Sequence, residues 1–264
     1  MGAIITMSST PSFSPKAPTN AIDAYVDLMK RCLLNWLYAD AEDKLVRANG
    51  NLEHARLVGR DWPAMAHTMI GLARLENIQH CSETILREKI PGDFLEAGVW
   101  RGGACIFMRA ILQAYQIKDR TIWAADSFAG LPPPNPQLYP QDVGLNLHQF
   151  PQLAVSLDQV KSYFARYGLQ DEQVKFLQGW FRDTLPTAPV KQLALLRVDG
   201  DMYESTTDVL KNLYSKVVSG GFVIIDDYQD IPACRQAVED YRHAHHITET
   251  IIPIDWTGVY WRKG

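Results

Sequence analysis

The chain has two hydrophobic rhythms, and the change between them divides it in two. From residue 21 to residue 90 apolar residues recur every three or four positions, as Leu28, Cys32 and Trp36 do, which predicts amphipathic helices. A charged loop that contains Gly and Asn, around 48–61, separates a first helical stretch from a second one at 65–90. We therefore expect an N-terminal helical segment over 21–90.

From residue 91 onward, short apolar runs alternate with helical patterns. Strands are predicted at 94–99, 121–125, 174–177, 193–198 and 222–225, helices at 101–115, 157–167, 205–217 and 232–244, and a closing hairpin at 248–252 and 258–262. This alternation predicts a Rossmann-like α/β domain over 91–264, with a mostly parallel sheet covered by helices on both faces. Ligands of such sheets bind at the carboxyl ends of the strands.

Local signals refine two segments of this domain. Ser205 and Asp208 have capping-box spacing, and Ser219-Gly220-Gly221 is expected to end the helix that they begin. Residues 131–151 contain six prolines. A loop of that length is more often a lid or a binding loop than a plain connection.

Composition limits the classes of function. The 264 residues are 47% hydrophobic, which is enough for one buried core. The net charge of −4 lacks the excess of positive charge that is typical of nucleic-acid-binding proteins. No apolar run is long enough to span a membrane. Residues 1–20 are rich in Ser, Thr and Pro, lack signal-peptide features and are expected to form a flexible arm. Four widely spaced cysteines indicate reduced thiols and, by default, a cytoplasmic protein.

The first candidate site follows the strand at 94–99. Glycines at 98, 102 and 103 allow a tight turn and a close approach to a ligand. Trp100 breaks the GxGxxG order of a dinucleotide site, which argues against a nicotinamide-dependent oxidoreductase. Glu96 favours a cationic ligand, such as the α-ammonium group of S-adenosylmethionine.

Two further positions extend this pocket. Asp126 ends the second strand, where a carboxylate can accept hydrogen bonds from ribose hydroxyls, although a turn cap would place an aspartate there too. Gly179 and Trp180 follow the third strand. An aromatic ring there can cover one face of an adenine, but packing in the core fits equally well.

The second candidate site is a group of carboxylates. Asp199 and Asp201 follow the fourth strand, and Asp226 and Asp227 follow the fifth. Adjacent parallel strands lie roughly 4.8 Å apart, so these acids are expected to face one another. Crowded carboxylates need a cation or a proton. Oxygen ligands without Cys or His favour Mg²⁺, with Mn²⁺ or Ca²⁺ as alternatives, over zinc.

Five motifs together resemble the macrocin O-methyltransferase family, whose members methylate sugar hydroxyls on antibiotics and related natural products. They are LEAGVWRGG (95–103), ADSFAGLP (125–132), GWFRDTLP (179–186), LRVDGDMYEST (196–206) and IIDDY (224–228). The segment AHTMIGLARLENIQ (66–79) resembles the family's N-terminal helix, which closes over the cofactor. The resemblance covers the chain from about residue 25 to its end.

The resemblance implies a class I methyltransferase fold, S-adenosylmethionine, Mg²⁺, a homo-oligomer and a glycosylated natural product as the acceptor. Asp199, Asp226 and Asp227 would bind the metal, and Asp201, beside Asp199, would be the general base. The implied cofactor-binding residues are Glu96, Gly98, Gly102, Asp126, Ser127, Gly179, Trp180, Thr68 and Met69.

Other functions fit parts of the pattern. Asp199-Gly200-Asp201 also matches the DxD pair of a metal-dependent glycosyltransferase, although phosphates favour Lys, Arg and amide-rich loops. A catechol-like phenol could replace the sugar, because its paired oxygens also chelate Mg²⁺. A non-catalytic binding protein would be expected to lack the acids, and all of them are present.

Overall fold

The computed structural model describes residue 13, residues 18–38 and residues 52–264. Its centre is a seven-stranded sheet of order β3-β2-β1-β4-β5-β7-β6. The first five strands are parallel, β7 runs antiparallel to β5, and β6 antiparallel to β7. The strands are β1 Asp93–Ala97, β2 Ile122–Asp126, β3 Val174–Gln178, β4 Leu193–Val198, β5 Val217–Ile225, β6 Ile252–Pro253 and β7 Val259–Arg262.

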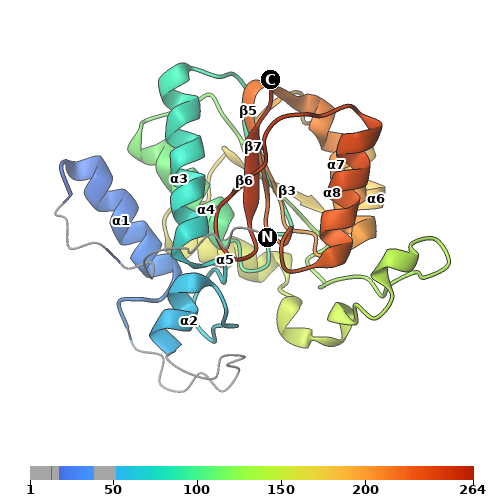
Figure 1. Ribbon diagram of the computed structural model, residues 1–264. Coiled ribbons are helices and arrows are strands. Elements are labelled where there is room, and N and C mark those ends of the chain that lie inside the picture. Colours follow the sequence, from blue (N-terminus) through green and yellow to red (C-terminus); the bar gives the residue numbers. More distant parts are fainter. Residues whose placement is uncertain (1–12, 14–17, 39–51) are drawn as a thin grey trace, which may run out of the picture.

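Helices cover both faces of this sheet (Figure 1). One face is covered by α1 Ala21–Leu33, α3 Gly71–Glu88, α4 Gly103–Ala114 and α5 Leu157–Arg166; on the other side lie α6 Phe181–Thr184, α7 Tyr203–Leu213 and α8 Pro232–Ala244. The short α2 (Leu52–Val58) lies at one end of the molecule. The predicted α/β fold, with extra N-terminal helices and a C-terminal hairpin, is confirmed.

The core has two halves, one on each face of the sheet. Along the central strands, Phe94 and Leu195 pack with α3, α4 and α5, whereas Leu95 and Leu196 pack with α7 and α8. Successive strand residues point to opposite faces, so a strand covered on both sides must be apolar at every position. Every residue of β4 is buried. One of them is charged, and it organises the site described below.

Several predicted boundaries were wrong. The helix α2 forms within the predicted charged loop, of which residues 48–51 lie outside the described residues. The second N-terminal helix, α3, begins at Gly71 rather than at residue 65. Ser219, Gly220 and Gly221 lie inside β5, because α7 already ends at Leu213 and a 3₁₀ turn follows it.

The predicted capping box at Ser205 was also wrong. Helix α7 begins at Tyr203, and its N-cap residue, Met202, has no side-chain capping bond. The hydrogen-bond acceptor for the first N–H groups of α7 comes instead from the proline-rich loop, residues 131–151. The fully buried carboxylate of Asp142 accepts hydrogen bonds from the backbone N–H of Tyr203 at 2.6 Å and of Glu204 at 3.1 Å. A distant side chain has replaced the local cap.

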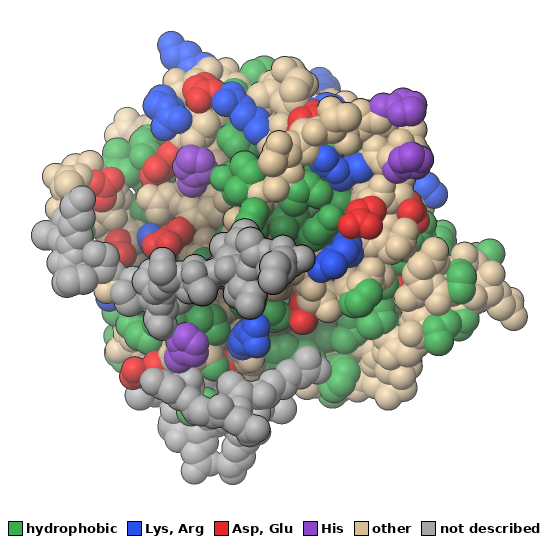
Figure 2. Space-filling view, in the orientation of Figure 1, with side chains coloured by type: hydrophobic (Ala, Val, Ile, Leu, Met, Phe, Trp, Pro, Cys, Tyr) green, Lys and Arg blue, Asp and Glu red, His purple; other side chains and the backbone are tan. Residues whose placement is uncertain are grey.

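The loop over 131–151 has local structure. It contains 3₁₀ turns at Pro140–Asp142 and Leu147–Gln149, and another follows at Pro151–Leu153. Its outer part carries exposed hydrophobic side chains, since Leu138 is 70% and Val143 64% exposed, and hydrophobic atoms mark the surface of this projecting segment in Figure 2. Among the described residues, no helix is both long and apolar enough to cross a bilayer.

Candidate functional site

A cavity of about 1230 Å³ lies where the carboxyl ends of β1, β2, β4 and β5 meet the N-terminal segment and the proline-rich loop. All the predicted site residues except Gly102 line it. These lining residues are Thr68, Met69, Glu96, Gly98, Asp126, Ser127, Gly179, Trp180, Asp199, Asp201, Asp226 and Asp227. The parallel topology therefore brings segments far apart in sequence into one site.

The glycines after β1 bring protein segments together. Gly98 has a φ of +91°, and a Cβ there would lie 1.7 Å from the backbone oxygen of Asp199, so only glycine lets the ends of β1 and β4 meet. Gly102 has a φ of +83° and faces Val160 of α5 rather than the cavity. At Gly103, a Cβ would lie 2.3 Å from the backbone oxygen of His67.

Asp126 holds the turn after β1 in place. Its carboxylate accepts hydrogen bonds from the backbone N–H of Val99 at 2.6 Å, of Phe128 at 2.7 Å and of Trp100 at 3.4 Å. Burial raises the pKa of Asp126, and these hydrogen bonds oppose that rise. The same carboxylate lines the cavity, so it can order this turn and contact a ligand.

Glu96 is paired with Arg197, the buried charge of β4. The two residues are neighbours in the register of β1 and β4, and the guanidinium donates to the carboxylate. The thiol of Cys105 also donates to Glu96, at 2.9 Å. Burial raises the pKa of Glu96 to about 7, against the opposing charge of Arg197. The cavity thus holds a carboxylate that is ionised only near and above neutral pH.

Three acids converge at the ends of β4 and β5. One carboxylate oxygen each from Asp199, Asp226 and Asp227 lies within 4.8 Å of the others. The Oδ2 atom of Asp227 is buried without a hydrogen-bond partner. Burial, with Asp226 close by, raises the pKa of Asp199 to about 6, and burial near the other acids raises that of Asp227. A group of three carboxylates in which one buried oxygen has no hydrogen-bond partner fits the binding of a divalent cation.

Asp201 lines the cavity next to these acids, at a turn where its φ is +56°. Aspartate is one of the few residues besides glycine that adopt this left-handed region, because its short polar side chain can form local hydrogen bonds. Burial raises the pKa of Asp201 to about 8, and the charges of Asp199 and Asp226 add to the rise. Once ionised, a carboxylate with a raised pKa is a stronger base than a solvated aspartate, and a pKa of about 8 means that the ionised form predominates only above that pH.

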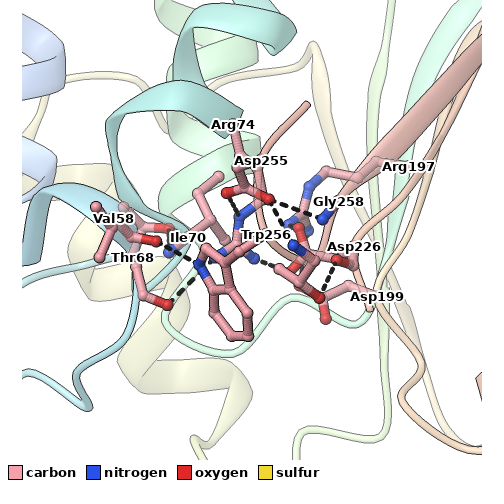
Figure 3. Close-up of polar contacts among 12 residues, drawn as sticks. Val58, Thr68, Ile70, Arg74, Arg197, Asp199, Asp226, Asp255, Trp256 and Gly258 are labelled. Carbon is pink, nitrogen blue, oxygen red and sulfur yellow. Dashed lines mark hydrogen bonds and ion pairs between the residues drawn. The ribbon is translucent and has the colours of Figure 1, made fainter. Parts of the chain in front are cut away.

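Sequence reasoning missed two arginines that bind these acids. Arg197 donates to Asp199 at 2.8 Å and also to Asp226. Arg74 of α3 donates to the other oxygen of Asp226, and Figure 3 shows the two guanidinium groups on either side of the acids. A charge in the apolar strand LALLRV could have revealed Arg197. No local pattern marks Arg74, whose partner lies 152 positions away.

The N-terminal segment contributes through the turn before α3. Thr68 is buried there and Met69 half-buried, and both line the cavity. They precede the first residue of α3, Gly71, so they belong to the turn and not to the helix. The contact between Gly103 and the backbone of His67 joins this turn to the start of α4.

Comparisons with known proteins agree along almost the whole chain. A family model for macrocin-O-methyltransferase (TylF) matches residues 22–263. The chain is 52% identical to a mycinamicin III 3''-O-methyltransferase of Micromonospora griseorubida over 252 residues, which make up 94% of this chain and 99% of that relative. It is 53% identical over 245 residues, 92% of this chain and 94% of the relative, to an 8-demethyl-8-(2,3-dimethoxy-alpha-L-rhamnosyl)-tetracenomycin-C 4'-O-methyltransferase of Streptomyces olivaceus.

A solved structure, that of the O-methyltransferase NovP, has the same fold. It superposes with a TM-score of 0.87 at 51% sequence identity, and the match covers 92% of this chain and 99% of that one. The similarity therefore extends over most of the chain.

Proposed function

Because the chain belongs to the macrocin O-methyltransferase family, we propose that it transfers a methyl group from S-adenosylmethionine to a sugar hydroxyl of a glycosylated natural product, assisted by Mg²⁺. It is an O-methyltransferase. The observation that carries the proposal is the group of three carboxylates beside Asp201 in the cavity that also contains Glu96.

In this proposal the two groups of residues have separate tasks. Glu96 binds the amino group of the methyl donor, and Asp126 with Ser127 binds its ribose. Gly179 and Trp180 lie beside the adenine, and Thr68 and Met69 close the donor site from the N-terminal side. Gly98 and Gly102 shape the turn. All of these residues except Gly102 line one cavity, which supports the assignment.

Methyl transfer is an in-line displacement, so the acceptor oxygen must approach the methyl carbon opposite the sulfur. Asp199, Asp226 and Asp227 would hold the divalent cation, which when bound supplies positive charge that stabilises a developing alkoxide. Asp201 accepts the hydroxyl proton as the carbon–oxygen bond forms and the carbon–sulfur bond breaks. The loop over 131–151 excludes water and selects the acceptor, in keeping with Leu131 and Leu147, which line the cavity.

The names of the relatives bear on the acceptor. One relative is named as a 3''-O-methyltransferase and the other as a 4'-O-methyltransferase of a rhamnosyl compound. We infer a glycoside acceptor for this chain and leave the hydroxyl position to experiment. A catechol-like phenol is the alternative acceptor, because two adjacent oxygens meet the same geometric need.

We also propose that the chain forms a homo-oligomer through its N-terminal segment. Leu28 is 48%, Leu37 45% and Tyr38 76% exposed, so this segment presents large apolar side chains that a second copy of the chain could cover. Light scattering tests this assembly. A dimer or larger species is expected, and a monomer at micromolar concentration would refute it.

The experiment that tests the function begins with calorimetric titrations. S-adenosylhomocysteine should bind with Mg²⁺ and with chelator, whereas nucleotide-sugars and NAD should not. A panel of glycosides and catechols is then incubated with S-adenosylmethionine, with Mg²⁺ or with chelator, and the products are measured by mass spectrometry. A gain of one methyl group on a glycoside only with Mg²⁺ supports the proposal. Nucleotide-sugar binding without S-adenosylhomocysteine binding would overturn it.

A further inference from the structure

Asp226 is held from two sides by buried arginines. Arg197 donates to its Oδ1 atom and Arg74 to its Oδ2 atom. The side chains of Arg74 and Asp226 are each only 5% exposed, so this is no solvated surface pair. These hydrogen bonds fix the orientation of the carboxylate, and each of its oxygens retains a further lone pair.

Arg74 is itself held by three acceptors from three parts of the chain. Its Nε atom donates to Asp255 at 3.0 Å, one terminal nitrogen donates to Asp226, and the other donates to the backbone oxygen of Gly59 at 3.3 Å. Gly59 has a φ of +66°, and a Cβ there would lie 2.4 Å from the guanidinium. The planar fork of an arginine can satisfy all three acceptors at once, which an ammonium group cannot do in the same geometry.

The turn between β6 and β7 holds both Arg74 and the main chain of Asp226. Asp255 accepts hydrogen bonds from the backbone N–H of Gly258 at 2.8 Å and of Thr257 at 3.0 Å, which fix its carboxylate. The hydroxyl of Thr257, a buried residue, donates to the backbone oxygen of Asp226 at 2.9 Å. Figure 3 shows Arg74 between Asp255 and Asp226, with a dashed line to each carboxylate.

The same turn is tied to the N-terminal segment. The indole of Trp256 donates to the backbone oxygen of Val58, the last residue of α2, at 2.7 Å (Figure 3). The guanidinium of Arg60 lies 4.2 Å from the centre of the Trp256 ring. Arg74 and the turn therefore form a rigid connection from α2 and α3 to one acid of the site.

From this geometry we infer that Arg74 is a positioning residue, which orients Asp226 for a divalent cation while Asp255 orients Arg74; this role rests on the metal site of the proposed function. Two effects oppose each other here. The positive charge of Arg74 disfavours a nearby cation, but Asp255 offsets that charge. Hydrogen bonds that orient a ligating carboxylate typically improve metal affinity by about 10–100-fold, so orientation outweighs the remaining repulsion.

The experiment measures Mn²⁺ affinity by electron paramagnetic resonance, a readout that does not depend on activity. Arg74→Met should weaken Mn²⁺ binding at least about tenfold. Arg74→Lys, which keeps the charge but loses the fork, should also weaken it. The affinity for S-adenosylhomocysteine in chelator should change less than about twofold. Arg109→Met is the matched control, because Arg109 is a buried arginine of α4 paired with Asp171, and neither residue lines the cavity.

A double-mutant cycle separates positioning from a general loss of stability. Asp255→Asn should weaken Mn²⁺ binding in the parent chain but have little further effect in Arg74→Met, which removes both the hydrogen bonds and the charge through which Asp255 acts. If Arg74→Met fails to fold, Arg74→Lys and Asp255→Asn still carry the test. Mn²⁺ binding by the folded variants as tight as in the parent would overturn the role of Arg74. A parent chain that binds S-adenosylhomocysteine but not Mn²⁺ would overturn the proposed metal site as well.

Discussion

The carboxylate of Asp142 lies 2.6 Å from the backbone nitrogen of Tyr203 and caps helix α7 from a loop 61 positions away in the sequence. Asp201, the proposed base, lies two residues before this helix. The loop expected to cover the acceptor is thus fixed to the segment that contains the proposed base, through a side chain with no exposed surface.

Removing this cap should weaken both stability and turnover. Asp142→Ala leaves two N–H groups at the start of α7 without their acceptor, which costs about 1 kcal/mol and lowers the melting temperature by about 2–4 °C. We expect kcat to fall as well, because the turn at Asp201 loses its support. Asp142→Asn keeps one acceptor oxygen and should lie in between. A melting curve and kcat that match the parent would contradict this account.

Asp201→Asn tests the base. The amide is almost the same size but cannot take a proton, so kcat should fall by about 10²–10⁴-fold. S-adenosylhomocysteine should bind as in the parent, because the base is needed for the proton of the acceptor and not for the methyl donor. Single-turnover methylation and calorimetry measure the two quantities. Full turnover by Asp201→Asn would show that another group accepts the proton.

The raised pKa of Glu96 predicts that cofactor binding depends on pH. Its folded-state pKa of about 7 means that the carboxylate is mostly protonated at pH 6 and mostly ionised at pH 8. The ammonium group of the ligand needs the ionised form, so affinity for S-adenosylhomocysteine should increase about tenfold from pH 6 to pH 8. Glu96→Gln should bind more weakly at pH 8 and show little of this slope. Calorimetry across this range decides, and a flat profile for the parent would rule out the contact.

Gly98→Ala should move the turn after β1, beside the proposed donor site, away from Asp199 at the end of β4. Its methyl group would collide with the backbone oxygen of Asp199, and the residue would still need a positive φ. We expect a lower melting temperature and weaker binding of both Mn²⁺ and S-adenosylhomocysteine. Gly168→Ala is a control, since Gly168 also has a positive φ but has no neighbour within 4 Å of an added Cβ. Equal ligand affinities in both variants would contradict the expected displacement of Asp199.

The sequence predicts this site well where the order of the strands alone determines which residues lie next to each other. Asp199, Asp226 and Asp227 meet because β4 and β5 are adjacent and parallel, and an apolar run followed by acids reveals this in each segment separately. The class I methyltransferase fold implied by the motifs is confirmed by the similarity to NovP.

Contacts that depend on tertiary packing could not be predicted. The reason for glycine at position 98 is a backbone oxygen about 100 residues later, and the cap of α7 is Asp142 rather than the local Ser205. Capping-box spacing is a local signal, and a buried acid from elsewhere can satisfy the same N–H groups. Arg74 has an unremarkable position in an amphipathic helix, and its importance appears only when α3 lies against the end of β5.

Arg197 has a consequence for how the two ligands affect each other's binding. One guanidinium is the common counter-ion of Glu96, in the proposed methyl-donor site, and of Asp199 and Asp226, in the proposed cation site. A ligand that draws one of these carboxylates toward itself frees part of the shared charge for the others. Such coupling is reciprocal by thermodynamic necessity. Binding of the donor should therefore change the affinity for the cation, and binding of the cation should change the affinity for the donor by the same factor.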